Sequence, residues 1–281
     1  GAGDNAAAAV GTGVVRPGEA FTSIGTSGVV YAHTSEMKHD SKGRVHVFCC
    51  AVPGAWHVMG VTLAAGSSLQ WFRNEFFQAE KIQAEKQGVS TYKLIDEMAA
   101  KVSPGSEGLV YLPYIMGERT PHLDPAARGV FFGISQRHSK AHFARSIMEG
   151  VSYSLRDCLE IIRGDLGLDI KSMLVTGGGA APFWREILTD VYGARTHTIV
   201  SSEGPALGAA LLAGVGVGLF DSVEAACDAC VVKADGLEPN EKRHAIYNES
   251  YELFTSLYPD LKAAFRRLQA TEQAWEEMQE S

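Results

Sequence analysis

The sequence lacks the features that mark several common classes of protein. Five cysteines in 281 residues are too few, and odd in number, for a disulfide framework. The longest apolar run, residues 205–220, is shorter and richer in glycine than the ~20 residues of a membrane span, and it predicts a buried helix. Lys and Arg number 25 against 33 Asp and Glu, and the net charge of -8 disfavours nucleic acid and membrane surfaces as partners. Because no apolar leader opens the chain, we expect a cytoplasmic location.

Common metal and phosphate motifs are missing as well. The C-x-x-C pair at 227–230 has no second pair to complete a zinc site, so we expect two cysteines on a helix face. Cys49 and Cys50 lie in a strand-like run and are expected to pack in the core. His138 and His142 have the spacing of two metal ligands but lack a third. The chain has neither G-x-x-x-x-G-K-[ST] nor a G-x-G-x-x-G at its glycine run, which disfavours P-loop enzymes and dinucleotide binders.

Hydrophobic patterns predict a mixed α/β fold. Two β-rich arms around a Gly-Thr-Ser-Gly turn predict a hairpin over residues 21–32, and a further strand over 44–51 extends it into an antiparallel meander. Apolar residues then recur every three to four positions from 69 to 102, which indicates helices. A longer helix, capped by Ser139, is expected to bury one stripe that runs to residue 162.

The second half of the chain predicts parallel strands. A short buried strand is expected within 108–115. A strand over 172–180 that ends in glycines, a helix over 182–193 and a strand over 196–200 then make one β-loop-α-β unit. A helix or a broken helix is expected at the C-terminus, with an interruption near Pro259. These elements indicate one domain, a mixed sheet with helices on its faces.

Three glycine-rich segments suggest a site for phosphate groups: "GAGDNAAAAVGTG" at 1–13, "SIGTSG" at 23–28 and "VTGGGA" at 175–180. Small residues let a backbone approach a ligand closely, and exposed N–H groups in such turns bind phosphate oxygens. Two of the segments join strands, and one leads into a helix N-terminus. Three such segments in one domain therefore predict a nucleotide site.

Asp4 is the strongest candidate for a chemical role. A lone aspartate beside glycines is ordinarily a turn former or a helix cap. The alternative is a general base that takes a proton from a hydroxyl group as its oxygen attacks phosphorus. Asn5 either hydrogen-bonds a polyol or caps the helix that "NAAAAVG" begins.

The other glycine segments carry the remaining candidates. Thr26 and Ser27 either hold phosphates with the amides of their turn or belong to an ordinary hairpin. The glycines of 177–180 follow a strand, where open α/β sheets bind ligands, and here we favour a functional role. The charged loop "GERTPHLDPAARG" at 117–129 is expected to be held together by its own Arg–Asp pairs rather than to bind phosphate.

Longer segments carry a family resemblance. In order, they are "GAGDNAAAAVGTGVVRPGEAFTSIGTSGVVYA", "CCAVPGAWHVMGVTLAAGSSLQWFR", "MGERTPHLDPAARGVFFGIS", "HFARSIMEGVSYSLRDC" and "VTGGGAAPFWREILTDVYG". Together they resemble the C-terminal half of xylulokinases, in the FGGY carbohydrate kinase family, over nearly the whole chain. The resemblance implies an α/β, actin-like ATPase (ribonuclease H-like) fold. It also implies that residues 1–281 are the C-terminal nucleotide-binding domain of a two-domain sugar kinase whose N-terminal sugar-binding domain is absent.

Carried over by position, the resemblance implies roles for single residues. Asp4 would deprotonate the sugar hydroxyl, and Asn5 would contact the sugar. The residues implied at the phosphate path and beside the adenosine are Gly25, Thr26 and Ser27, and Gly178, Gly179 and Ala180. Mg²⁺ would lie between phosphates and carboxylates, largely through the absent domain, and no residue of this chain is assigned to it. "GGGAAPFW" is one residue shorter than the family's usual stretch, so adenine contacts beyond Ala180 stay open.

The resulting expectation is a kinase with ATP and Mg²⁺ as cofactors. It converts a ketose, foremost D-xylulose, into its phosphate, D-xylulose 5-phosphate. Gluconate, ribulose and glycerol are alternative acceptors within the family. A non-catalytic, actin-like ATP-binding module is the alternative from another class. The expected partners are the sugar, ATP and the missing domain; a homodimer is left open, and the chain alone is expected to be inactive.

Overall fold

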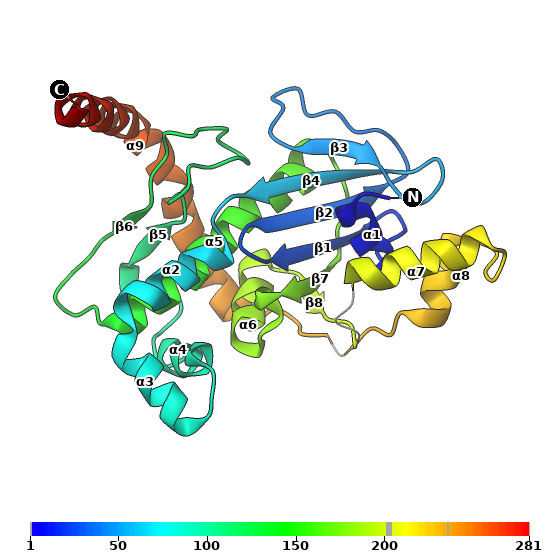
Figure 1. Ribbon diagram of the computed structural model, residues 1–281, viewed down its shortest axis with the longest axis horizontal. Coiled ribbons are helices and arrows are strands. Elements are labelled where there is room, and N and C mark those ends of the chain that lie inside the picture. The colour runs from blue at the N-terminus through cyan, green and yellow to red at the C-terminus, as the bar shows by residue number, and fades with distance from the viewer. Residues whose placement is uncertain (1, 201–203, 235, 281) are drawn as a thin grey trace.

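A six-stranded mixed sheet forms the centre of the molecule, with helices on both faces (Figure 1). The computed structural model describes residues 2–200, 204–234 and 236–280. The strand order is β3-β4-β2-β1-β7-β8. The strands are β1 (Glu19–Ile24), β2 (Gly28–Thr34), β3 (His46–Cys49), β4 (Trp56–Thr62), β7 (Ser172–Gly177) and β8 (Arg195–His197). The expected α/β class with a mixed sheet is confirmed.

The first four strands are antiparallel, as expected, but their order is not that of the chain. The hairpin β1–β2 turns between Ile24 and Gly28. Strand β4, which the hydrophobic pattern does not mark, pairs with β2 and separates it from β3. The expectation that Cys49 packs in the core is wrong, because β3 is an edge strand and leaves that side chain exposed. Cys50 is half-buried.

The parallel part of the sheet follows the prediction closely. Strand β7 pairs in parallel with both β1 and β8. Between β7 and β8, helix α6 (Pro182–Tyr192) starts with a proline in its first turn and ends at Gly193, which has a φ of 56°. Proline at the start and a left-handed glycine at the end are the expected boundary signals of a helix. The β-loop-α-β unit is confirmed.

Residues of the strands alternate between two cores. In β2, Val30 and Ala32 lie in the core beneath α5 (Lys140–Glu160), whereas Tyr31 lies in the core beneath α1 (Asp4–Gly11). This is the period of two that a strand imposes. Ser139 is the N-cap residue of α5, and the stripe expected from it lies in the core as predicted. Figure 1 shows α5 behind the sheet and α1 on the near side.

Helix α7 (Gly204–Gly216) crosses α1 with the backbones in close approach. A Cβ atom at Gly208 would collide with the carbonyl oxygen of Ala7, and one at Gly11 with that of Gly204. The prediction of a buried helix here is wrong: Gly204, Gly208 and Leu211 are its buried residues, because α7 is covered where it meets α1 and α8 and its other side is exposed. Helix α8 (Val223–Cys230) follows, with Cys227 buried, Cys230 exposed and both thiols free. The helix-face prediction for this pair is confirmed.

The remaining elements lie beside the sheet. They are α2 (Gly66–Phe76), α3 (Gln78–Gln87), α4 (Thr91–Ala99), a small sheet of β5 (Val110–Leu112) and β6 (Val130–Phe132), and α9 (Glu241–Glu280). Helix α9 runs through Pro259 without the expected interruption. Tyr258 and Phe265, before and after that proline, are both buried, and this packing favours a continuous helix although an internal proline is unfavourable. In the described ranges, no helix is long and apolar enough to cross a membrane.

Candidate active site

Two cavities flank the hairpin turn Gly25–Ser27 at the carboxyl end of β1. The first, of about 370 Å³, contains Thr26 and Gly178 in its lining. The second, of about 580 Å³, contains Asp4, Ser27 and Ala180. Gly25 lines both cavities. The turn therefore forms the boundary between two adjoining concave sites.

The turn is held from behind by the start of α2. The backbone N–H of Gly66 donates to the Gly25 carbonyl oxygen at 2.9 Å, and the N–H of Ala65 donates to the Thr26 carbonyl oxygen at 3.0 Å. Ser67 adds its N–H and its hydroxyl to the latter oxygen, at 3.2 and 2.9 Å. The hydroxyl groups of Thr26 and Ser27 have no partner among the described residues, and the whole turn is exposed. The turn is thus rigid in its backbone and open in its hydroxyl groups.

The glycine run after β7 lies against the same turn. Gly177 has a φ of 67°, and a Cβ atom there would collide with the Ile24 carbonyl oxygen, so only glycine fits. Gly178 and Ala180 line the first and second cavities respectively. Gly179 is buried instead, and a Cβ there would lie 2.8 Å from Ile24 Cδ1. Of the three predicted residues Gly178–Ala180, Gly178 and Ala180 line the cavities, whereas Gly179 packs closely against Ile24.

Asp4 and Asn5 open helix α1 and line the second cavity. The Asp4 side chain is exposed, and its Oδ1 accepts from the Asn5 backbone N–H at 2.8 Å and from Asn5 Nδ2 at 3.3 Å. A carboxylate in the first turn also suits the positive end of the helix dipole. The carboxylate therefore lies in the same cavity as Ser27 and Ala180, where it can accept a proton from a bound hydroxyl group.

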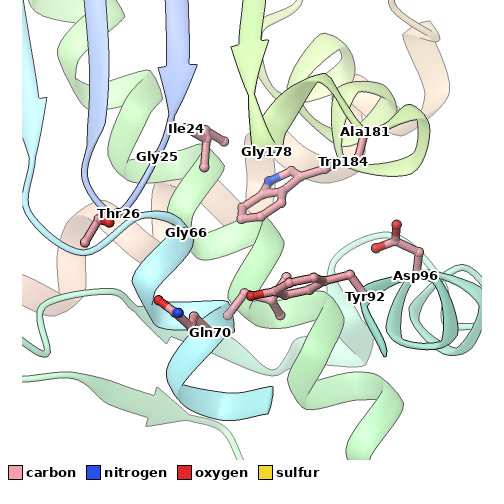
Figure 2. Close-up of a pocket in the computed structure, with 11 residues that line it drawn as sticks. Ile24, Gly25, Thr26, Gly66, Gln70, Tyr92, Asp96, Gly178, Ala181 and Trp184 are labelled. Atoms are coloured by element: carbon pink, nitrogen blue, oxygen red, sulfur yellow. The ribbon is translucent and has the colours of Figure 1, made fainter. Parts of the chain in front are cut away.

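The first cavity is lined by residues that the motifs did not indicate. Figure 2 shows Gly66 and Gln70 from α2, Tyr92 and Asp96 from α4, and Trp184 from α6 around it. Their one signal in the sequence is "AAGSS" at the start of α2, where Gly66 lets the helix meet the turn: a Cβ atom there would collide with the Gly25 carbonyl oxygen. Helix α6 is far from α2 and α4 in the sequence.

Three polar details shape this cavity. Trp184 donates its indole N–H to Ser152 Oγ at 3.2 Å, which orients the ring. The Arg73 guanidinium lies 4.6 Å from the centre of the Tyr92 ring. Burial raises the pKa of Asp96 to about 6, with a smaller contribution from the charge of Glu97. The cavity therefore has fixed aromatic walls and one carboxylate.

The charged loop at 117–129 is a structural support. Glu118 is buried, and its carboxylate accepts from the Thr62 hydroxyl at 2.5 Å and from the Leu63 N–H at 2.9 Å. Burial raises its pKa to about 7. Asp124 accepts from the Tyr258 hydroxyl at 2.7 Å. The expectation of internal Arg–Asp pairs is wrong within the described ranges, because the acidic groups of the loop bind hydroxyl and amide donors, most of them on other elements.

Comparisons with known proteins identify the family of this chain. The family model "FGGY family of carbohydrate kinases, C-terminal domain" matches residues 20–217. The chain belongs to this family, and its fold is the actin-like ATPase fold expected from the resemblance.

Within this family, the chain is similar to several xylulose kinases. The chain is 42% identical to the xylulose kinase of Lactococcus lactis over 92% of this chain and 50% of that protein. It is 38% identical to the xylulose kinase of Staphylococcus epidermidis strain RP62A over 93% of this chain and 51% of the relative. A crystal structure named as a xyloylose kinase from Brucella ovis has a TM-score of 0.81 at 32% identity, with 94% of this chain and 52% of that chain covered. The chain thus spans about half the length of the curated relatives it matches.

Proposed function

We propose that this chain is the nucleotide-binding half of an ATP-dependent sugar kinase that phosphorylates D-xylulose to D-xylulose 5-phosphate. One observation carries the proposal: the Asp4 carboxylate shares the second cavity with Ser27 and Ala180, beside a turn that also borders the first cavity, which is large enough for a nucleobase. The xylulose kinases that the chain resembles support the acceptor. The proposed enzyme acts in the cytoplasm, where ATP is supplied.

The proposed mechanism assigns one part of the substrates to each cavity. The nucleoside occupies the first cavity, and the triphosphate crosses the turn, where Thr26 and Ser27 offer amides and hydroxyl groups to its oxygens. Asp4 accepts the proton of the sugar hydroxyl as that oxygen forms a bond to the γ-phosphorus and the bond to the β-phosphate oxygen breaks. ADP leaves with the bridging oxygen. Asn5 binds a neighbouring sugar hydroxyl. Gly178 borders the adenosine in the first cavity, and Ala180 borders its phosphate side from the second cavity.

Magnesium enters the proposal through the nucleotide. Among the described residues, no group of three or more His, Cys, Asp or Glu side chains can hold a metal ion. The Asp4 carboxylate lines the second cavity, so it would fit beside a Mg²⁺ ion that phosphate oxygens and the other half of the enzyme would mainly hold. The ion would neutralise charge that develops on the phosphates.

A second acceptor has one observation in its favour. The gluconokinase of Bacillus subtilis is 33% identical over 81% of this chain and 44% of that protein. The test is ATP consumption by the full-length protein with D-xylulose, D-ribulose, gluconate, glycerol or no acceptor. Acceleration by D-xylulose supports the proposal, and acceleration by gluconate alone assigns the second acceptor. Indifference to every acceptor identifies a non-catalytic ATP-binding module.

Replacing the proposed base tests the mechanism. In the full-length protein, Asp4→Asn is expected to lower turnover by about 10²–10⁴ and to leave ATP affinity unchanged, because the amide cannot accept the proton. Steady-state kinetics and calorimetric ATP binding measure the two effects. Asp221→Asn, at an exposed aspartate outside both cavities, is the control. Equal turnover in Asp4→Asn and the control contradicts the role of Asp4.

A further inference from the structure

The first cavity is a slot with apolar walls. Ile24, Leu69, Tyr92 and Trp184 contribute to its lining, and about 370 Å³ accommodates a planar base with its ribose. Figure 2 shows the rings of Trp184 and Tyr92 on opposite sides of this space. Aromatic side chains on two sides favour a flat aromatic ligand, because aromatic rings attract one another in stacked and in edge-to-face arrangements.

The negative charge of Asp96 favours one orientation of a nucleotide in this slot. Its carboxylate lies at the end of the cavity away from Thr26 (Figure 2). A carboxylate repels a triphosphate, whereas the amides and hydroxyl groups of the Gly25–Ser27 turn attract it. The triphosphate therefore belongs at the turn and the base beside Asp96.

The Asp96 carboxylate has unused hydrogen-bonding capacity. No side chain or backbone group within 2–200, 204–234 and 236–280 donates a hydrogen bond to it, although the residue is half-buried. Its pKa of about 6, raised by burial, leaves it ionised at pH 7.5, so both oxygens accept. A partly desolvated carboxylate without a donor is unfavourable, and a ligand that donates to it recovers that free energy.

We propose that Asp96 selects the nucleobase by accepting a hydrogen bond from the 6-amino group of adenine. The same carboxylate rejects purines with a 6-oxo group, because two acceptors would face each other. This inference deepens the proposed function and rests on it for the presence of a nucleotide in the cavity. Asp96 is thus a specificity-determining residue that touches the base and takes no part in phosphoryl transfer.

The experiment compares the binding of ATP with that of ITP, which carries a 6-oxo group in place of the amino group. Calorimetry on the full-length protein at pH 7.5, without sugar, is expected to show ATP binding about 10- to 100-fold more tightly. Asp96→Ala is expected to reduce this preference to about threefold or less, mainly by weakening ATP. Asp96→Asn, whose amide both donates and accepts, is expected to raise the affinity for ITP.

A matched control lies one residue further along the same helix. Glu97→Gln removes an exposed charge from α4 and is expected to leave the ATP-to-ITP ratio within about twofold, since surface charges are screened. An unchanged ratio in Asp96→Ala overturns the inference. So does a loss of affinity on Asp96→Ala that disappears with 2′-deoxy-ATP, because the carboxylate would then bind the ribose.

Binding without an acceptor keeps the two proposals separate. A protein that prefers ATP through Asp96 but phosphorylates no sugar retains this inference and loses the kinase proposal. A protein that phosphorylates xylulose with ATP and ITP equally well retains the kinase proposal and loses this inference.

Discussion

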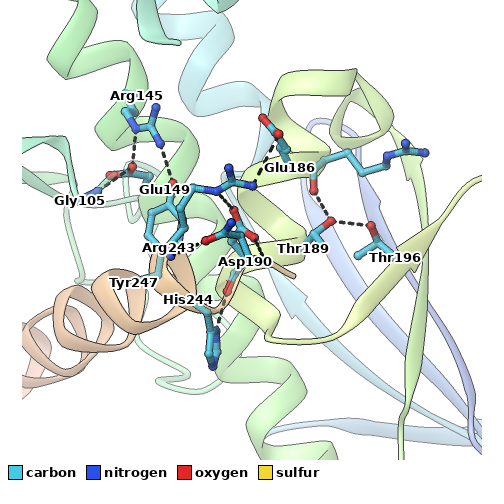
Figure 3. A network of polar contacts seen from close by, with 12 residues as sticks. Gly105, Arg145, Glu149, Glu186, Thr189, Asp190, Thr196, Arg243, His244 and Tyr247 are labelled. Carbon is cyan, nitrogen blue, oxygen red and sulfur yellow. Dashed lines mark hydrogen bonds and ion pairs between the residues drawn. The ribbon is translucent and has the colours of Figure 1, made fainter. Parts of the chain in front are cut away.

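Two regions of the molecule hold polar side chains in opposite ways. In the buried network of Figure 3, the Glu149 carboxylate accepts from Arg145 Nε at 2.7 Å, from the Ser106 hydroxyl at 2.7 Å and from the Gly105 N–H at 3.1 Å. Arg145 donates further to the Tyr247 hydroxyl at 2.7 Å. This network joins α5 to α9, and each of its charged groups has several partners.

The two cavities show the contrary arrangement. The hydroxyl groups of Thr26 and Ser27 and the carboxylate of Asp96 have no partner in the described part of the chain. Buried polar groups in proteins are normally paired, because an unpaired one costs free energy. The paired groups of the network stabilise the fold, whereas the half-buried Asp96 carboxylate and the exposed hydroxyl groups of Thr26 and Ser27 are available to a ligand. Substitutions in the two regions should therefore separate stability from binding.

The largest expected effect is on the network. Glu149→Ala leaves Arg145 buried without its carboxylate and is expected to lower the free energy of unfolding by about 3–5 kcal/mol. The matched control is Glu160→Ala, which removes another i, i+4 pair of α5, with Arg156 and a carboxylate that is 44% exposed. That change is expected to cost about 0.5 kcal/mol or less. Urea unfolding of the full-length protein measures both, and equal losses contradict the comparison.

A second effect, of intermediate size, depends on pH. Burial raises the pKa of Asp157, which accepts from the Tyr251 hydroxyl, from 3.8 to about 7. Because this pKa is raised on folding, the stability that the group contributes is present at low pH and is lost as the pH rises towards 7. Asp157→Asn has no such charge to bury.

The expected measurement is a difference between the variant and the parent. Between pH 5 and pH 8, the free energy of unfolding of Asp157→Asn should rise relative to the parent by about 2–3 kcal/mol. Asp260→Asn, at an exposed position of α9, should follow the parent at every pH. A constant difference for Asp157→Asn across this range would show that the buried carboxyl does not titrate there.

The smallest effect on stability is expected at the turn. Thr26→Ala and Ser27→Ala remove exposed hydroxyl groups without partners, so unfolding free energies should change by about 0.5 kcal/mol or less. If the turn binds phosphates, each substitution should raise the KM for ATP by roughly 5- to 10-fold. Ser35→Ala, at another exposed serine, should change neither quantity. Loss of stability without a change in KM would make the turn structural.

Local signals predicted most of the elements correctly. Ser139 and the stripe after it indicated α5, and the proline and glycine at its two ends indicated α6. The predictions of burial failed where it depends on which other helices and strands cover a residue. Cys49 lies on an edge strand, and α7 has only α1 as its main cover, so apolar residues there remain exposed.

The candidate site was predictable only in part, for the same reason. Asp4 and the two glycine segments carry a recognisable pattern, and two of the three residues in Gly178–Ala180 reach the cavities. Tyr92 and Asp96 sit in an ordinary amphipathic helix, and nothing in its period distinguishes a residue that faces a cavity from one that faces the core.

The sequence by itself determined the hairpin, the β-loop-α-β unit and the family resemblance, because turns, caps and periodicity depend on residues close together in the chain. Only the tertiary structure decided that α4 and α6 place Asp96 and Trp184 around one slot, and that β4 inserts beside β2. Such contacts join residues tens of positions apart, and they form where packing the two faces of the sheet brings those residues together.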